Sequence, residues 1–403
     1  MDAEVAETGR DLAGTLASVL QALPGAPHQP QRLARMLGVN VVLTSRLLKA
    51  TRSTDALAIA HTIPGPEPLR RVLKIVQGMN VDADVVRAAE EAVDRFEHLI
   101  NSHAGDRAAL DSMISSWLPD VRTKLDLVSR QAVFKGMSHI RGYTVNTGLT
   151  SVLLTPSTDP AKCDRTTIIG RYGLRRTRAG VKPTISTSTT AREDLSVTTL
   201  DGRPVGEGHS TILDEFSNSV VNRLEVLREG ELTRYLLGGD EVGLRTAVDL
   251  VIAEHRPRVG RAVFTEGSPN HAAYGDLVED PLRQFVFDIL VHDDVYPGRD
   301  PQLAVYNSVG AGFPAFFLDP SRRWDLVDCD EKVVPLGHGI RRFRTASIPN
   351  YLDVLEHACK QRGYDPVAFR GYRLQIAFPL IGYTYLMGFE LSGAASGENM
   401  ADV

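Results

Sequence analysis

The chain has 403 residues, of which 43% are hydrophobic and 24% charged, and its formal net charge is −5. This length allows two or three domains, and the composition is that of a folded globular chain, not a disordered or fibrous one. The acidic start MDAEVAETGRD lacks the apolar segment of a secretory signal, and the most apolar tract, Leu374–Phe389, is too short to span a membrane. The three distant cysteines, Cys163, Cys329 and Cys359, match no zinc-binding pattern. We therefore expect a cytoplasmic protein with no membrane contact, no metal and no other cofactor.

The first 80 residues predict a group of short helices. Apolar residues recur at helical spacing over Val5–Leu23, and the proline and glycine that follow end this segment. Asp55 is a candidate cap for a further short helix, and another helix is predicted over Glu67–Gln77.

Between these helices, the stretch Gln31–Lys49 (QRLARMLGVNVVLTSRLLK) predicts two amphipathic helices joined by a tight turn. Gly38 stands where such a turn often needs a positive φ, and Asn40 is a candidate N-cap of the second helix. The stretch resembles the DNA-reading motif of helix-turn-helix transcriptional regulators, for instance those of the lactose-repressor type. The resemblance is confined to this stretch, and it implies that a head of residues 1–80 binds double-stranded DNA.

The second helix of the motif departs from the usual regulator pattern. Val41, Val42 and Leu43 stand where such regulators carry polar side chains, and valine offers only contact with a thymine methyl group. Ser45 and Arg46 remain as the nearest base contacts. A helical pair used only for packing is the alternative interpretation. The residues that the resemblance assigns to DNA are Arg32, Arg35, Asn40, Val41, Val42, Ser45, Arg46, Lys49 and Arg52.

Positive charge gathers around this motif. Residues 30–80 include eight basic and two acidic residues, although the whole chain is net negative. A basic module joined to an acidic remainder is typical of a DNA-binding head with a companion domain. Ordinary solvated arginines and lysines would give the same composition, so both interpretations stay open.

Residues 81–140 predict a helical connector, with apolar positions that mark helices over 85–100, 108–117 and 121–134. Helices between a DNA-binding head and a larger body commonly dimerise. The alternative is a helical layer that packs on the body.

From residue 141 to 392 the pattern predicts an α+β body, because short strands in groups alternate with helices. The whole chain is therefore expected to be α+β, with an all-helical N-terminal head and connector. Strands are predicted at 151–155, 166–170, 184–188, 195–200, 261–265, 284–292 and 303–307. Helices are predicted over Ile212–Leu237, Glu241–Glu254 and Ser347–Arg362. An apolar hairpin is expected over Tyr372–Glu390, and a disordered tail over 393–403.

Catalytic motifs are absent from the sequence, which has no Walker loop and no G-x-G-x-x-G, G-x-S-x-G or H-E-x-x-H pattern. His292–Asp294 ends a strand that also carries Asp288, but the spacing matches no metal motif, and a polar turn explains it equally well. The glycine-bracketed run Val334–Gly339 could approach a phosphate, but glycine and proline at a bend are the favoured cause, and Ser268–His271 is interpreted as a turn before a helix. No catalytic residue is predicted.

Five basic residues of the body lie in one strand-turn-strand segment, GRYGLRRTRAGVKPT, with almost no acid nearby. They are a candidate anion-binding or nucleic-acid surface, and pairing with acidic groups of the body or of a partner chain is the alternative. These residues are Arg171, Arg175, Arg176, Arg178 and Lys182.

Together, these features favour a sequence-specific DNA-binding transcriptional regulator. Its partners would be double-stranded DNA, a second copy of the chain in a homodimer and a small-molecule effector. The body would sense a ligand, bind a partner or oligomerise. The alternatives are an enzyme whose activity lies in the body and a structural or assembly protein, with the motif as a packing unit in either case.

Overall fold

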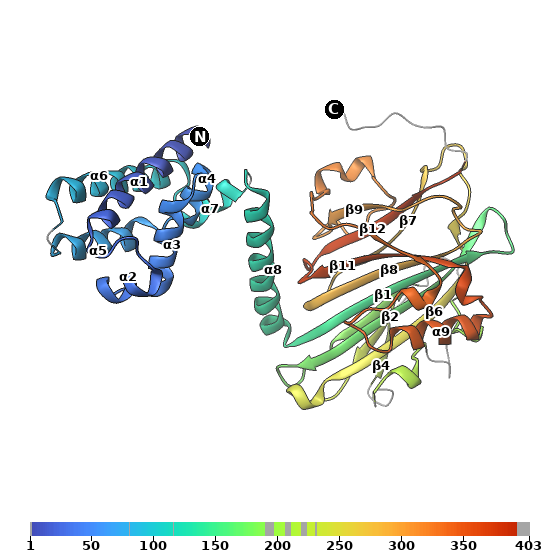
Figure 1. Ribbon diagram of the computed structural model, residues 1–403. Helices are drawn as coiled ribbons and strands as arrows, with labels where there is room; N and C mark the ends of the chain where they lie inside the picture. Colours follow the sequence, from blue (N-terminus) through green and yellow to red (C-terminus); the bar gives the residue numbers. More distant parts are fainter. Residues whose placement is uncertain are drawn as a thin grey trace. The chain divides into compact units, whose positions relative to one another are not determined.

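The computed structural model describes residues 2–392, apart from Asn80, Ser116 and the segments 190–196, 206–210, 219–223 and 230–231. The chain divides into two compact units, Met1–Val128 and Ser129–Val403. The first is helical and the second is built on β-sheets (Figure 1), so the predicted α+β class with an all-helical N-terminal part is confirmed. The expected tail over 393–403 lies outside the described residues.

A single buried apolar cluster holds the first unit together, and it draws on helices from both ends of the unit. Leu12 and Leu33 lie in this cluster with Phe96 and Leu110, which belong to the stretch expected as a connector. The helices of the described residues here are α1 (Asp2–Ala22), α2 (Pro30–Leu37), α3 (Val41–Arg52), α4 (Ala56–Thr62), α5 (Pro66–Gln77), α6 (Ala83–His103) and α7 (Arg107–Ser115). The next helix, α8 (Pro119–Arg141), crosses the boundary between the two units.

The predicted turn and caps of the first unit are confirmed. Gly38 ends α2 in the left-handed region, with φ +63° and ψ +29°. The side chain of Asn40 accepts a hydrogen bond from the Val42 amide at the start of α3, 2.7 Å away. Asp55 caps α4 in the same way, by accepting from the amides of Leu57 and Ala58. Each cap satisfies amide groups that have no partner within the first helical turn.

A six-stranded sheet in the order β10-β11-β8-β1-β2-β6 forms the centre of the second unit. β1 and β8 run parallel, and the other neighbours are antiparallel. β1 is buried along nearly all of its length, as expected for a strand covered on both faces. The bounds are β1 (Tyr143–Pro156), β2 (Lys162–Arg176), β6 (Val248–Arg261), β8 (Leu282–His292), β10 (Val334–His338) and β11 (Phe369–Ala377).

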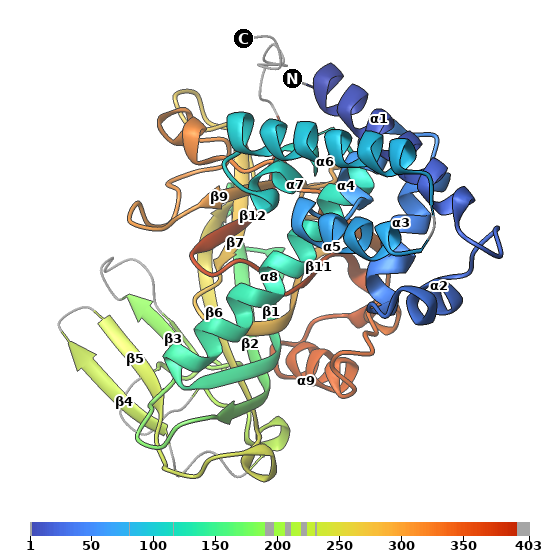
Figure 2. The same ribbon diagram turned by 90° about the vertical axis from the view of Figure 1, so that its left-hand side faces the viewer.

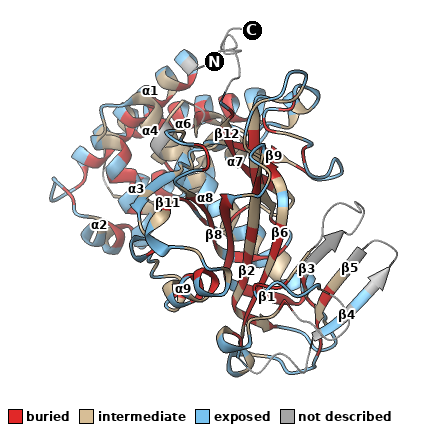
Figure 3. Cartoon of the chain, turned by 90° about the vertical axis from the view of Figure 1, so that its right-hand side faces the viewer, coloured by how far each residue is buried: buried red, intermediate tan, exposed pale blue. Residues whose placement is uncertain are grey.

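The two faces of this sheet are covered differently. On one face Val286 and Leu290 belong to a cluster with Tyr351 and Leu355 of α9 (Tyr351–Arg362). On the other face Phe285, next to Val286 on β8, belongs to a cluster with residues of a three-stranded sheet, as the alternation of a strand requires. Figure 2 and Figure 3 show these layers and the buried residues along the central strands. The order of that sheet is β7 (His271–Leu277), β12 (Tyr383–Glu390) and β9 (Gln302–Asn307), and a third sheet has the order β3 (Thr184–Thr189), β5 (Leu232–Leu237) and β4 (Leu224–Glu229).

Two predicted helices of the body are wrong. The stretch Ile212–Leu237 contains a 3₁₀ turn followed by β4 and β5, which pair antiparallel. The stretch Glu241–Glu254 contains a 3₁₀ turn and the first half of β6. Both stretches are rich in helix-forming residues, but pairing between strands overrides that local preference. The helix predicted over Ser347–Arg362 is confirmed as α9, which begins four residues later.

The hairpin predicted over Tyr372–Glu390 is also wrong, although both of its strands exist. β11 pairs with β8 and β10, whereas β12 pairs with β7 and β9 in another sheet. The chain leaves one sheet for the other after Ala377, where Phe378 has φ +51°. Of the two remaining strand expectations, 261–265 begins where β6 ends, and 195–200 has only an isolated bridge at Thr198 within its described residues. None of the helices in the described part of the chain combines the length and the apolar character needed to cross a bilayer.

Candidate nucleic-acid interface

The inner faces of α2 and α3 are buried as a helix-turn-helix requires. Leu33 and Leu37 of α2 and Leu47 of α3 are each no more than 2% exposed. Thr44 is fully buried, and its hydroxyl lies 2.9 Å from the carbonyl of Pro30 and 3.0 Å from that of Val41. A hydrogen bond here satisfies the only polar group of the side chain and ties the start of α3 to the start of α2.

The outer face of α3 is open to solvent. Val42, Ser45, Lys49 and Arg52 are exposed at helical spacing, so they follow one side of the helix. Val41 and Val42 are 45% and 65% exposed at the N-terminal end of the helix. Two exposed β-branched residues at this end give the outer face an apolar leading edge.

Charge is separated within the first unit. α2 and α3 together carry five basic residues and no acidic residue, whereas α1 and α6 together carry nine acidic and three basic residues. α1 and α6 lie side by side, and α2 lies on the other side of the unit (Figures 1 and 2). The summed field is therefore positive on the side of the motif and negative on the side of α1 and α6.

Ion pairs reduce the number of unneutralised basic residues outside the motif. Arg70 of α5 contacts Asp94 at 2.6 Å and Glu97 at 2.5 Å, and this guanidinium group lowers the pKa of Glu97. Its charge, which the sequence pattern counts as part of the basic head, is thus neutralised by α6. None of the five basic residues of α2 and α3 forms an ion pair with a described residue, and three of them also form no hydrogen bond with one: Arg32, Arg35 and Lys49.

Two other basic residues of the motif bind the protein itself. Arg46 donates to the carbonyls of Thr62 at 3.0 Å and Ile63 at 3.2 Å, and Arg52 donates to the carbonyl of His28 at 2.6 Å. Thr62 and Ile63 end α4, where helix carbonyls lack partners within the helix and attract positive charge. The sequence places Arg46 nearest the bases, but its guanidinium group lies against α4. Asn40 is likewise engaged, since its side-chain oxygen caps α3.

The five basic residues singled out in the body do not gather on one surface. Arg171 pairs with Asp280 at 2.6 Å, and Lys182 pairs with Glu225 at 2.7 Å. Arg176 is buried and donates to backbone carbonyls, including that of Gly238 at 2.6 Å. Arg178 donates to the carbonyl of Ile140 at 3.3 Å, and Arg175 is half-buried.

Asp288 belongs to a buried network that joins the central sheet to α9. Its two carboxylate oxygens accept hydrogen bonds from the Arg373 guanidinium at 2.8 and 2.7 Å, and one also accepts from the Tyr351 hydroxyl at 2.7 Å. His292 contacts Asp294 at 3.5 Å instead. Within the described residues, no three His, Cys, Asp or Glu side chains are placed to hold a metal ion together.

The sequence pattern missed a group of acidic residues that accompany Arg171. Asp276, Glu279 and Asp280 lie within five residues of one another, at the end of β7 and just after it, and all three line a cavity with Arg171. Their clustering in the run DLVED is visible in the sequence, but their proximity to Arg171 depends on sheet pairing. No protein-family model and no curated protein sequence matches this chain.

Proposed function

We propose that this chain is a sequence-specific DNA-binding transcriptional regulator that acts in the cytoplasm as a homodimer. The observation that carries this proposal is the helix-turn-helix of α2 and α3. Its inner face is buried, and its two helices carry five basic residues and no acidic one, of which Arg32, Arg35 and Lys49 form no hydrogen bond or ion pair with a described residue. An acidic opposite side favours approach of DNA from the side of the motif, because phosphate repels carboxylates.

α3 would lie in the major groove with its N-terminal half toward the base edges. Ser45 would donate or accept a hydrogen bond there, and Val41 and Val42 would contact thymine methyl groups. Lys49 on α3, together with Arg32 and Arg35 on α2, would bind phosphates and set the orientation on the duplex.

Arg46 and Arg52 take a positioning role in this proposal. Their hydrogen bonds to backbone carbonyls fix α3 against α4 and against the segment before α2. In a homodimer, two such α3 helices would read half-sites about 10 base pairs apart, or a multiple of that spacing.

The test is a salt titration of the full chain on duplex DNA, with two matched arginine variants. Arg35→Ala should weaken binding and make the slope of log affinity against log salt shallower by about one, since one phosphate contact is lost. Arg87→Ala removes another exposed arginine, from α6 on the acidic side, where it pairs with Asp84, and should change neither quantity. Equal effects of the two variants, or no binding at low salt, would contradict the proposal.

A further inference from the structure

One stretch of the body carries basic residues and no acidic residue. Residues 332–352 include four lysine or arginine residues and no aspartate or glutamate, although the whole chain is net negative. Three of the four, Arg341, Arg342 and Arg344, fall within four consecutive positions, in and just after the 3₁₀ turn Ile340–Arg342. All three are exposed. Positive charge is therefore concentrated on one surface loop, Gly339–Arg344.

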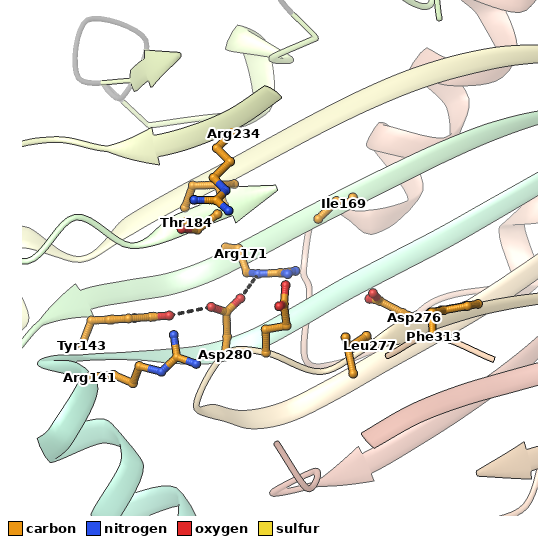
Figure 4. Close-up of a pocket in the computed structure, with 12 residues that line it drawn as sticks. Arg141, Tyr143, Ile169, Arg171, Thr184, Arg234, Asp276, Leu277, Asp280 and Phe313 are labelled. Atoms are coloured by element: carbon orange, nitrogen blue, oxygen red, sulfur yellow. Dashed lines mark hydrogen bonds and ion pairs between the residues drawn. The ribbon is translucent and has the colours of Figure 1, made fainter. Parts of the chain in front are cut away.

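Two other arginines of the body have acidic groups beside them, as the cavity in Figure 4 shows. Asp280 accepts a hydrogen bond from Arg171 at 2.6 Å and another from the Tyr143 hydroxyl at 2.7 Å. Burial raises the pKa of Glu279 in the same cavity, and the positive charge of Arg141 opposes that shift. Charges of opposite sign thus offset one another within this cavity.

The guanidinium groups of Arg341, Arg342 and Arg344 have no such neighbours. None of them forms an ion pair or a hydrogen bond with any residue that the structure describes. Asp293 contacts His338 of β10 instead, at 3.4 Å. Three positive charges within four positions repel one another, and an anionic partner that lies across them removes this repulsion.

The backbone of the loop is held from the inside. Ile340 and Phe343 are 1% and 0% exposed, and a Cβ added at Gly371 of β11 would meet the Phe343 ring at 2.6 Å. The Arg373 guanidinium donates to the carbonyl of Phe343 at 2.6 Å and to that of Arg344 at 2.8 Å. The apolar side chains are therefore enclosed, and the exposed arginine side chains extend from a fixed support.

This arrangement distinguishes among anionic partners. A membrane surface or a protein partner is usually anchored by apolar side chains, but both large apolar residues of the loop are buried. A small anion is usually held in an enclosed pocket, whereas these arginines are exposed. A nucleic-acid backbone requires neither feature, because its phosphates bind exposed basic side chains and the release of counterions favours binding.

We propose that the loop Gly339–Arg344 binds the phosphate backbone of duplex DNA. This inference rests on the proposed function for the identity of the partner, and it adds a contact on the body to the one made by the helix-turn-helix. Phosphate contacts carry no sequence information. The loop would therefore raise the affinity for DNA of any sequence, and α3 would read the bases.

The test is a salt titration of the full chain on duplex DNA, with variants of the loop. Replacement of Arg341, Arg342 and Arg344 together by glutamine should make the slope of log affinity against log salt shallower by about three, and Arg341→Gln alone by about one. Replacement of the same three by lysine should keep most of the slope, because an ammonium group also pairs with phosphate. Thermal unfolding of each variant shows whether it is folded.

Arg245→Gln is the matched control. Arg245 is also exposed within a 3₁₀ turn of the body, Leu244–Thr246, but Asp240 and Glu241 lie within five positions of it. Its replacement should leave the slope unchanged. A loss of slope equal to that of Arg341→Gln would overturn the assignment to the loop, since any exposed arginine would then have the same effect.

Comparison with Arg35→Ala separates this inference from the proposed function. A wild-type slope in the triple glutamine variant, with a shallower slope in Arg35→Ala, would overturn the inference alone. A shallower slope in the triple variant only would support the inference and contradict the phosphate contact of α2. Absence of DNA binding by the wild-type chain at low salt would overturn both. Loss of binding to phosphatidylserine vesicles by the triple variant, with unchanged binding to DNA, would identify a membrane as the partner and overturn the inference.

Discussion

Two arginines on α2 of the first unit contrast with three arginines of the second unit. In the first unit, Arg32 and Arg35 are exposed on α2 without ion pairs to described residues, and acidic residues gather on other helices. In the second unit, Arg171, Arg176 and Arg373 are largely enclosed and bonded to carboxylates or backbone carbonyls. Basic residues on a surface are available to a partner, whereas basic residues in a core hold the fold together. A count of charges in the sequence does not separate these two roles.

Breaking the most enclosed pair should have the largest effect. Arg373 and Asp288 have side-chain exposures of 8% and 0%. Arg373→Met should destabilise the body by about 3–5 kcal/mol, because it leaves a buried carboxylate without its partner. Lys182→Met is the matched control, since its pair with Glu225 is about half exposed and should contribute no more than about 1 kcal/mol. Urea unfolding measures both losses of unfolding free energy. Similar losses in the two variants would show that the buried pair contributes no more to stability than the exposed pair.

A buried histidine should give the body a pH dependence. Burial, and then the positive charge of Arg362, lower the pKa of His255 to about 4, while Asp164 at 3.9 Å opposes that shift. Arg362 donates to Nε2 at 2.9 Å, so the ring's proton lies on Nδ1, which is 3.0 Å from the Thr166 hydroxyl. The neutral ring is therefore the form that fits.

Because the unfolded chain takes up a proton near pH 6.5 and the folded chain does not, stability should fall as the pH drops from about 6.5 to about 4. The loss attributable to His255 should be on the order of 3 kcal/mol. Urea unfolding across this range, with wild type and His255→Gln, measures it. An equally steep loss in the variant would show that other groups cause it.

Arg46 is predicted to stabilise the first unit, although it lies within the helix-turn-helix. Arg46→Ala should lower the stability of the α3–α4 contact by about 1–2 kcal/mol, since two carbonyls at the end of α4 lose a charged donor. Amide hydrogen exchange of α4 in the full chain would report this loss. Arg35→Ala, on the exposed face of α2, should leave amide exchange of α4 unchanged. Equal protection of α4 in the two variants would show that Arg46 does not stabilise the contact between α3 and α4.

The smallest expected effect concerns the turn. A Cβ added at Gly38 meets no atom within 4 Å, so any cost of substitution comes from its φ of +63° alone. Gly38→Val should destabilise the first unit by about 1 kcal/mol or more, while Gly38→Asn should cost less, because asparagine tolerates the left-handed region. Thermal unfolding of the two variants measures the difference in stability. Identical unfolding midpoints would show that the positive φ at residue 38 does not cause the loss.

Whether an interaction could be predicted from the sequence depends on how far apart its two residues lie along the chain. Gly38, Asn40 and Asp55 act on residues two to four positions away, so their types and spacing are sufficient to predict the turn and both caps. Arg46 binds a carbonyl 16 residues further along the chain, and Arg171 binds a carboxylate 109 residues away. Such partners depend on tertiary packing, so both the true role of Arg46 and the composition of the cavity lay beyond the sequence pattern.

In the proposed function, the outer face of α3 reads a DNA sequence. The most direct test is selection of bound duplexes from a random pool by the full chain, with Ser45→Ala and Arg46→Ala as companions. We predict that wild type enriches a consensus, that Ser45→Ala relaxes one position of it, and that Arg46→Ala keeps the same consensus at reduced affinity. Failure of the wild-type chain to enrich any consensus would contradict sequence reading, because the helix-turn-helix would then at most bind DNA without sequence preference.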